Sequence, residues 1–150
     1  MTMEEKNSRL SLLIINKDIA ILKELADFFS SKNIDVNLAS VKTQAMEIII
    51  MKEPGVIITD LSSPEKDNEF FKALRKIGIE SQLIIYSDHI TEDLKYKKQI
   101  GLVFALVKRT EGLERLLEVY KNANSAFAII HDINNKLHKE NEVYKRELDW

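Results

Sequence analysis

The sequence contains no cysteine, no excess of charge of one sign and no apolar run long enough to span a bilayer. The lack of cysteine excludes disulfides, thiolate metal sites and thiol catalysis, and it fits a reducing compartment. A formal net charge of -2 with interspersed signs gives no electrostatic footprint for nucleic acid or an anionic membrane surface. The segment before residue 10 contains acids, which a secretion signal lacks. We therefore expect a cytoplasmic protein that binds neither nucleic acid nor membrane.

What the chain does contain is typical of one globular domain with a short appendage: 150 residues, of which 45% are hydrophobic and 31% charged. Short apolar runs alternate with amphipathic stretches, which predicts a parallel sheet covered by helices on both faces. The expected strands lie at about 10–15, 34–39, 55–60, 82–86 and 102–107, and each is followed by a helical pattern.

This succession of strands and helices leaves little choice of topology. The expected fold is α/β, a flavodoxin-like doubly wound five-stranded parallel sheet with strand order 2-1-3-4-5 and an extended C-terminal helix. We expect residues 1–9 to be a disordered N-terminal segment, residues 10–121 to form the sheet domain and residues 122–150 to continue the last helix.

Local signals predict the limits of the first three helices. Asp18 is a candidate N-cap of the first helix, and the second ends at Pro54-Gly55. The third helix stops at Gly78. Its expected apolar face consists of Phe70, Phe71, Leu74 and Ile77.

Polar side chains follow four of the expected strands. Asn16 and Lys17 end the first strand, Asp60 the third, Ser87 the fourth and Lys108 the fifth. In open α/β sheets the carboxyl ends of the strands meet at one edge, where ligands bind. A carboxylate, a hydroxyl and two ammonium groups at this edge predict a site for an oxyanion, or for transferring one to Asp60. Each residue alone is also typical of a solvated loop. The prediction therefore depends on four strands ending in polar residues at the same edge.

The stretch "IITDLSSPEKDNEFFKALR" resembles the bacterial response-regulator receiver domain, a family of two-component signalling proteins, over roughly residues 10 to 121. It has the family's acid after a strand, then a three-residue gap, a proline, an acid and a helix. Ser87, Gly101 and Lys108 also match the family's pattern. The resemblance implies that Asp60 is the phosphoacceptor, Ser87 the hydroxyl that follows the phosphoryl group and Lys108 its ammonium partner. It also implies a sensor kinase or another signalling protein as the partner.

The sequence departs from the family where the metal would bind. The family has two acids after the first strand, the second of which binds magnesium, and this chain has Asn16 and Lys17 there. Asp18 comes one place too late and serves equally well as a helix cap. Magnesium requires carboxylate oxygens, and a lysine brings a competing positive charge. We therefore expect no cofactor and no bound metal at this edge.

Two further departures concern the residues around Lys108. The family's aromatic switch residue is Ala105 here, and Phe104 is displaced by one place, so it is predicted to face the other side of its strand. Arg109 replaces the proline that follows the lysine in the family.

The pattern leaves several interpretations of the Asp60 pocket open. Lys17 can take the position of magnesium and pair with Asp60, which would hold the pocket neutralised and unphosphorylated, as in a pseudo-receiver. Alternatively, Lys17 and Lys108 together neutralise the phosphoryl oxygens of a metal-independent phosphoacceptor, an interpretation favoured by the retained Ser87. The first is preferred, because loss of a divalent ion removes a large electrostatic contribution to phosphoryl transfer. A third is a sensor that holds an anionic ligand between the two lysines.

The region from residue 113 onward contains neither proline nor glycine and predicts one long helix. A heptad repeat begins at Leu113, and beyond about residue 134 only a narrow apolar stripe remains. Asn134 and Asn141 at a positions, and Glu140 facing Lys145 of a partner, favour a parallel coiled-coil homodimer. A single solvated helix, or one that folds back on its own domain, is the alternative. The a positions are Leu113, Tyr120, Phe127, Asn134, Asn141 and Leu148, and the d positions are Leu116, Ala123, Ile130, Leu137 and Tyr144.

Within this helix, "HDINN" begins at His131 and resembles the phosphoacceptor box of some sensor histidine kinases. The resemblance makes His131 an alternative phosphoacceptor. We prefer a histidine on the rim of a coiled coil, because the sequence has neither a second bundle helix nor a glycine-rich ATP-binding loop after it.

The sequence therefore predicts an atypical receiver in phosphorelay signal transduction that is not an enzyme and acts through protein-protein contacts. A phosphorylation-independent dimeric scaffold and a phosphotransfer protein that uses His131 are the alternatives.

Overall fold

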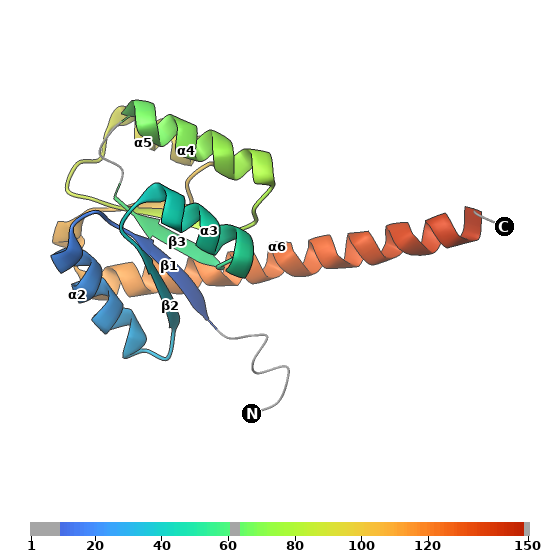
Figure 1. Cartoon of the computed structure of the whole chain (residues 1–150), viewed down its shortest axis with the longest axis horizontal. Coiled ribbons are helices and arrows are strands. Elements are labelled where there is room, and N and C mark those ends of the chain that lie inside the picture. Colours follow the sequence, from blue (N-terminus) through green and yellow to red (C-terminus); the bar gives the residue numbers. More distant parts are fainter. Residues whose placement is uncertain (1–9, 61–63, 149–150) are drawn as a thin grey trace.

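The computed structural model describes residues 10–60 and 64–148 (Figure 1). The elements follow one another as β1 (Ser11–Ile15), α2 (Ile19–Ser30), β2 (Asp35–Ala39), α3 (Lys42–Lys52), β3 (Val56–Thr59), α4 (Pro64–Ile77), β4 (Gln82–Tyr86), α5 (Glu92–Gln99), β5 (Ala105–Val107), the short 3-10 helix η1 (Arg109–Glu111) and α6 (Leu113–Leu148). The predicted disorder of residues 1–9 lies outside the described residues.

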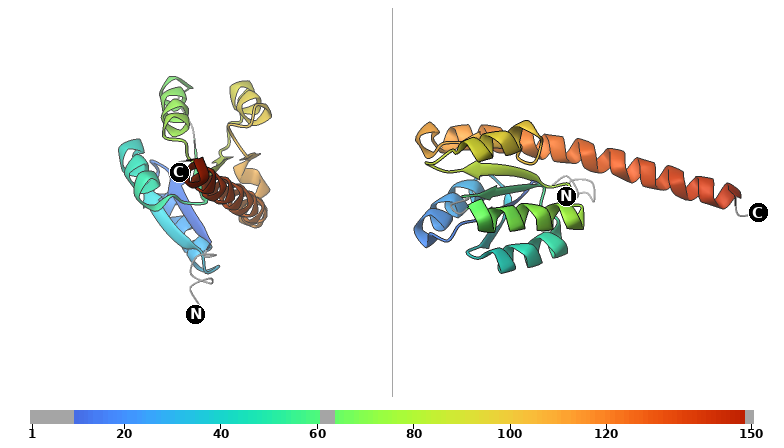
Figure 2. Two further views of the ribbon diagram at one scale, coloured as in Figure 1. Left: turned by 90° about the vertical axis from the view of Figure 1, so that its right-hand side faces the viewer. Right: turned by 90° about the horizontal axis from the view of Figure 1, so that it is seen from above.

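The five strands form one parallel sheet in the order β2-β1-β3-β4-β5, so the predicted flavodoxin-like topology is confirmed. The end-on view of Figure 2 shows helices on both sides of the sheet. The alternating side chains of each strand contribute to two separate cores, because successive residues of a strand point to opposite faces. One core is closed by α2 and α6, and the other by α3, α4 and α5.

The last strand is shorter than predicted and begins at Ala105 instead of residue 102. Gly101 has a positive φ of 86° just after α5. The backbone N–H groups of Leu102 and Val103 then donate to the carbonyl of Lys97, at 2.9 and 3.3 Å. Because these N–H groups close the turn after α5, the two residues do not join the sheet.

The helix ends follow the predicted local signals, with one exception on α4. Asp18 caps α2 by accepting a hydrogen bond from the backbone N–H of Ala20 at 3.0 Å, and Gly78 follows α4 with a φ of 69°. Ile77, however, is 43% exposed, so its assignment to the apolar face of α4 is wrong. Ile79 packs instead against the core that α3, α4 and α5 close, because the chain reverses at Gly78.

The prediction that Phe104 and Ala105 face opposite sides is wrong. Both are partly buried against the core that α2 and α6 close. Phe104 lies just before β5, where its N–H donates to the carbonyl of Leu83 at 2.7 Å, so the alternation of a regular strand does not apply to it.

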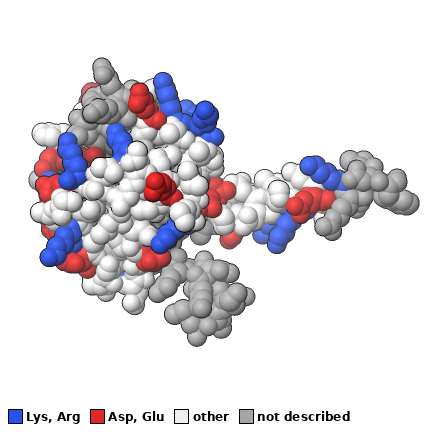
Figure 3. All heavy atoms as spheres, in the orientation of Figure 1, with Lys and Arg blue, Asp and Glu red and all other residues white. Residues whose placement is uncertain are grey.

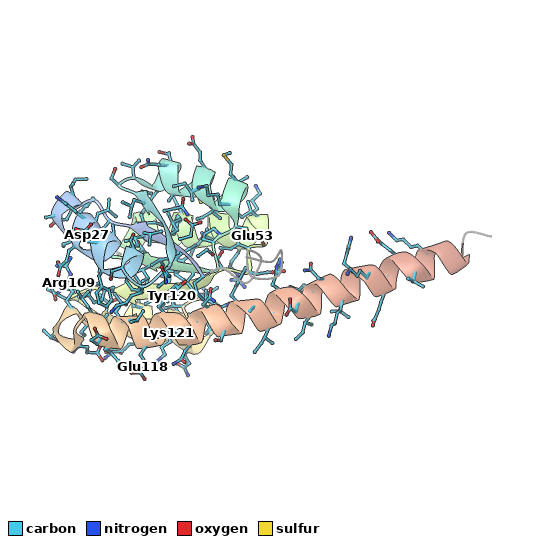
Figure 4. All side chains as sticks on the ribbon, turned by 90° about the horizontal axis from the view of Figure 1, so that it is seen from below. Asp27, Glu53, Arg109, Glu118, Tyr120 and Lys121 are labelled. Carbon is cyan, nitrogen blue, oxygen red and sulfur yellow. The ribbon has the colours of Figure 1, made fainter. Side chains whose placement is uncertain are left out.

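The first half of α6 packs on the sheet, and the second half projects past the amino ends of the strands (Figures 1 and 2). Tyr120 is fully buried, and its hydroxyl donates to the carbonyl of Ser11 at 3.0 Å. Figure 4 shows Tyr120 on the side of α6 that faces the domain and Glu118 on the outer side. Burial raises the pKa of Tyr120, so the phenol stays protonated and remains a donor.

Gly55 allows α6 to approach the start of β3 closely. A Cβ added at Gly55 would lie 2.7 Å from Oδ1 of Asn124 and 3.0 Å from a ring carbon of Phe127. Leu116, Tyr120 and Ala123 of the predicted heptad are therefore part of the domain's own core, as expected for a helix that packs on the sheet before it continues outward.

We predict that Tyr120→Phe lowers the free energy of unfolding by about 1 kcal/mol, because the buried carbonyl of Ser11 loses its donor while the packing of the ring is kept. Urea denaturation measures the change. Tyr96→Phe is the matched control, because Tyr96 is 58% exposed on α5 and should change stability by less than about 0.5 kcal/mol. Equal stability of the two variants would contradict the role assigned to the Tyr120 hydroxyl.

Candidate functional site at the carboxyl edge of the sheet

The strand register aligns the predicted site residues along the carboxyl edge of the sheet. Ile15 pairs with Thr59, and Thr59 pairs with Ile85, so Asn16 and Asp60 each follow directly at the ends of neighbouring strands. Ser87 and Lys108 follow the last residues of β4 and β5. Lys17 comes one residue beyond Asn16. The edge thus contains all five residues, whose chemical roles stay predictions.

Asn16 and Asp18 both use their side chains to hold the loop between β1 and α2. Asn16 is 6% exposed, and its Oδ1 accepts a hydrogen bond from the N–H of Asp18 at 2.9 Å. The Oδ1 of Asp18 in turn accepts hydrogen bonds from Ala20 and Ile21, at 3.0 and 3.5 Å. One oxygen of each side chain is therefore committed to backbone N–H groups at the start of α2.

Ser87 is buried, with 3% of its surface exposed. Its backbone N–H donates to the carbonyl of Val107 at 3.1 Å, which ties the end of β4 to β5. Its hydroxyl oxygen accepts a hydrogen bond from the N–H of His89 at 3.1 Å. A hydroxyl that accepts one hydrogen bond still has its own proton to donate to an incoming oxyanion.

The two lysines of the site are exposed, while Asp60 is half-buried. Lys108 precedes η1, and its backbone N–H donates to the side chain of Glu111 at 2.7 Å. The edge thus places one carboxylate and two lysines near one another, and the oxyanion site stays a prediction.

An ion pair that sequence reasoning did not find lies beside these residues. The guanidinium of Arg109 lies 3.6 Å from the carboxylate of Asp88. Burial raises the pKa of the neighbouring Tyr86, and the charge of Arg109 opposes that increase. Asp88 follows Ser87 and Arg109 follows Lys108, so the sequence indicates that both lie at this edge. It does not show that the two side chains contact each other.

His131, the alternative phosphoacceptor, lies at the opposite edge of the sheet from Asp60. Its Nδ1 is 2.7 Å from a carboxylate oxygen of Glu80, a residue that precedes β4, and its ring stacks on Phe127 with centroids 5.5 Å apart. Asn134 donates to the other oxygen of Glu80 at 2.6 Å. His131 is therefore bound to its own domain, a contact that the prediction of a histidine on the rim of a coiled coil did not include.

The contacts around Glu80 perturb both ionisable groups. The hydrogen bonds from Asn134 and His131 lower the pKa of Glu80 against the opposing effect of burial. The hydrogen bond with Glu80 raises the pKa of His131. The charged pair is therefore stabilised in the folded protein.

A groove of about 400 Å³ adjoins this contact at the same edge of the sheet. Phe71, Leu74 and Phe104 contribute apolar walls, whereas Glu80 and Asn134 contribute polar groups. The groove is thus remote from the residues that follow the strand ends.

The charge distribution agrees with the small net charge of the chain. Figure 3 shows acidic and basic side chains interspersed on one face of the domain, without a large area of a single sign. Among the helices within residues 10–60 and 64–148, none is both long and apolar enough to cross a membrane.

Comparisons with known proteins identify the fold. No protein-family model matches the chain, and no curated protein matches it. Among solved structures, the response-regulator receiver domain protein from Clostridium thermocellum has a TM-score of 0.71 and 19% identity, covering 81% of this chain and 98% of that one. A CheY-like receiver domain protein from Methanospirillum hungatei has a TM-score of 0.71 and 16% identity, and the match covers 80% of this chain and 97% of that one.

A structure named adenylate cyclase from Rhodopirellula baltica has a TM-score of 0.77 at 16% identity, and the match covers 87% of this chain and 98% of that one. Most of the similar structures are response-regulator receiver domains. The chain therefore has the receiver-domain fold, as its sequence motifs predicted.

We predict a pH-dependent contribution of the His131–Glu80 pair to stability. Its stabilisation is present below the ordinary histidine value of 6.5 and is lost as pH rises through the raised pKa of His131. It is present above the ordinary glutamate value of 4.5 and is lost as pH falls through the lowered pKa of Glu80. His131→Asn should therefore destabilise the protein most between pH 4.5 and pH 6.5, where both groups of the pair are charged.

The size of this effect is limited by solvent, because the side chain of His131 is 40% exposed. We expect a pH-dependent loss of about 1 kcal/mol or less, measured by urea denaturation in metal-free buffer across the pH range. His138→Asn, on an exposed turn of the same helix, is the control. A loss that does not change between acidic and alkaline pH would show that packing on Phe127 alone accounts for the effect of His131.

Proposed function

We propose that this chain is an atypical response-regulator receiver of a phosphorelay, which acts through contacts with a sensor kinase or another signalling protein and not by turnover. In this proposal Asp60 is the potential phosphoacceptor, and the family's magnesium site is lost. The receiver-domain fold and the alignment of Asp60, Ser87 and Lys108 along one edge support the proposal. The cyclase activity named for the Rhodopirellula baltica protein is not extended to this chain, because the likeness is one of fold.

The loop after β1 is the observation on which the loss of magnesium rests. Magnesium requires near-octahedral coordination by oxygens, most of them from carboxylates and water. Asn16 offers a neutral amide whose oxygen already accepts a hydrogen bond from Asp18, and Asp18 caps α2. Lys17 adds a positive charge beside them. The family's pair of metal-binding acids thus has no equivalent in this loop.

In the family, the charge of the magnesium ion lies beside the phosphoacceptor carboxylate, and Asp60 is half-buried here. We propose that Lys17 provides the positive charge by pairing with Asp60, so that the resting pocket is neutral without metal. Ser87 would then donate its proton either to Asp60 or, if phosphorylation occurs, to a phosphoryl oxygen.

The signal would leave through the face made by α5, β5 and α6. The family's aromatic switch residue is absent at Ala105, and Phe104 is packed into the core. This face therefore lacks a side chain that could alternate between buried and exposed positions at residue 105. A phosphorylation-independent scaffold, which presents one constant surface, is the second candidate that this observation favours.

The part of α6 that projects from the domain provides a second contact surface. Its apolar side chains are exposed, although such side chains normally pack against a partner. They are Ile133, Leu137 and Val143, which are 51%, 52% and 52% exposed, and of these Leu137 occupies a d position of the predicted heptad. Because His131 and Asn134 bind Glu80 of the domain, we propose that the part of α6 beyond them, residues 135–148, pairs with a second copy as a parallel coiled coil.

We predict that intact-mass analysis after incubation with acetyl phosphate detects no magnesium-dependent phosphoryl adduct on the wild-type protein. The variant with Asn16→Asp and Lys17→Asp should gain one, because it restores two carboxylates beside Asp60. Aspartate has nearly the shape of asparagine, so the hydrogen bond to Asp18 can persist at residue 16.

Asp60→Asn should abolish any adduct, whereas Asp88→Asn at the same edge serves as the matched control and should not. An adduct on wild type that requires magnesium would contradict the proposed loss of the metal site. An adduct that forms without magnesium would identify Lys17 and Lys108 as its substitute, and none under either condition would support the scaffold.

We predict that the wild-type chain is a dimer in analytical ultracentrifugation and that Leu137→Glu makes it monomeric, because a charge at a d position of the coiled coil would be buried without a partner. Lys139→Glu is the matched control, since Lys139 lies on the outer face of the same turn. A monomeric wild type, or a Leu137→Glu variant that remains dimeric, would contradict the proposed interface.

A further inference from the structure

Three side chains that are distant in the sequence meet at the amino edge of the sheet. Glu53 follows α3, Glu80 lies between α4 and β4, and His131 is on α6. Their nearest ligand atoms, one from each residue, all lie within 4.8 Å of one another. Figure 4 shows Glu53 at the end of the domain beyond which α6 projects. The cluster is far from the Asp60 pocket, which lies at the other edge.

We propose that Glu53, Glu80 and His131 bind a divalent transition-metal ion of the Zn²⁺ class, which fastens α6 to the domain. The ion would take Nδ1 of His131 and one carboxylate oxygen from each glutamate, and water would complete the coordination. The site does not depend on the proposed phosphorelay function, because it shares no residue with the carboxyl edge.

The spacing of the ligand atoms is close to that of a bound ion. Zinc lies about 2.0–2.2 Å from histidine nitrogen and carboxylate oxygen, so ligands at the corners of a tetrahedron are roughly 3.4 Å apart. Nδ1 of His131 and Oε2 of Glu80 are 2.7 Å apart because they share a hydrogen bond, and they would move slightly apart when an ion takes the place of the shared proton. Glu53 is exposed and long enough to close the remaining gap by side-chain rotation alone.

Residues outside the cluster orient two of the proposed ligands, His131 on α6 and Glu80 before β4. Asn134 donates to Oε1 of Glu80 at 2.6 Å, which leaves Oε2 directed at His131. The ring of Phe127 stacks on His131 at an interplanar angle of 21° and restricts its rotation. Hydrogen-bonded and packed neighbours of this kind are typical of metal ligands, because they reduce the conformational entropy lost on binding.

The donor set selects the class of ion. One imidazole and two carboxylates suit zinc and related transition metals, whereas magnesium and calcium prefer oxygen ligands alone. Two carboxylates also balance the two positive charges of the ion. The proton that His131 and Glu80 share is released to solvent when the ion binds, so metal and proton compete for the site.

Binding would join three chain segments at the point where α6 leaves the domain. The segment of α6 that follows His131 has the exposed apolar residues of the proposed coiled coil. A metal-bound His131 would fix the direction in which this segment projects, because rotation of the helix about its contact with the sheet would break the coordination.

The test uses the full chain, with Zn²⁺ in isothermal titration calorimetry and Co²⁺ in absorption spectroscopy. We expect that one ion binds per chain and that Zn²⁺ raises the unfolding temperature. The bound Co²⁺ should have the absorption spectrum typical of an ion with a low coordination number. Glu53→Gln and His131→Asn should each lose binding. Asn134→Ala should weaken it by roughly tenfold, as expected for loss of a residue that orients a ligand.

The exposed pair formed by His138 and Glu142, 3.1 Å apart on the same helix, provides the matched control. His138→Asn should leave the affinity and stoichiometry unchanged. Glu53 is exposed, so Glu53→Gln should keep the unfolding temperature of the metal-free protein, and its loss of binding cannot then be attributed to unfolding. Absence of a one-to-one complex, binding that survives Glu53→Gln and His131→Asn, or equal loss in His138→Asn would overturn the proposal.

Discussion

The packing of α6 against the sheet is the contact on which the rest of the structure depends. A parallel sheet must be covered on both faces, and α6 covers the face shared with α2 by burying Leu116, Tyr120 and Ala123. The Tyr120 hydroxyl satisfies the carbonyl at the start of β1, and Gly55 allows the helix to reach the start of β3. The helix therefore has one position along the sheet, and that position places His131 beside Glu80.

The helix α6 runs antiparallel to the strands, so His131 lies at the opposite edge of the sheet from the residues that follow the strands. The residues that follow the strands collect at the carboxyl edge, where Asp60, Ser87 and Lys108 lie at the ends of β3, β4 and β5. The helix passes the opposite edge, where carboxylates from two connections meet a histidine. Because the sheet lies between them, a change at one edge can reach the other only through the packing of the strands and α6, as a shift between packed arrangements. The proposed receiver and the proposed metal site are thus separable functions of one fold.

At the carboxyl edge, polar side chains support the local structure of the loops. Asn16 and Asp18 each satisfy backbone N–H groups that a short loop and a helix start leave unpaired. These hydrogen bonds preserve the geometry of the loop. The buried Ser87 similarly supports the turn to His89 through its hydroxyl.

The sequence by itself determined the strand order, the start of α2, the end of α4 and the group of residues at the carboxyl edge. Those features depend on local periodicity, capping and the rule that parallel strands end together. Only the tertiary structure decided what surrounds His131, because its partners Glu80 and Phe127 are brought together by the docking of α6 and not by any repeat. The heptad pattern could not distinguish a face that packs on its own sheet from one that packs on a partner, since both require the same apolar spacing. Ile77 and Phe104 were misassigned for a related reason. Ile77 is the last residue of α4 and Phe104 comes just before β5, and at the boundary of a regular element the period does not determine which way a side chain points.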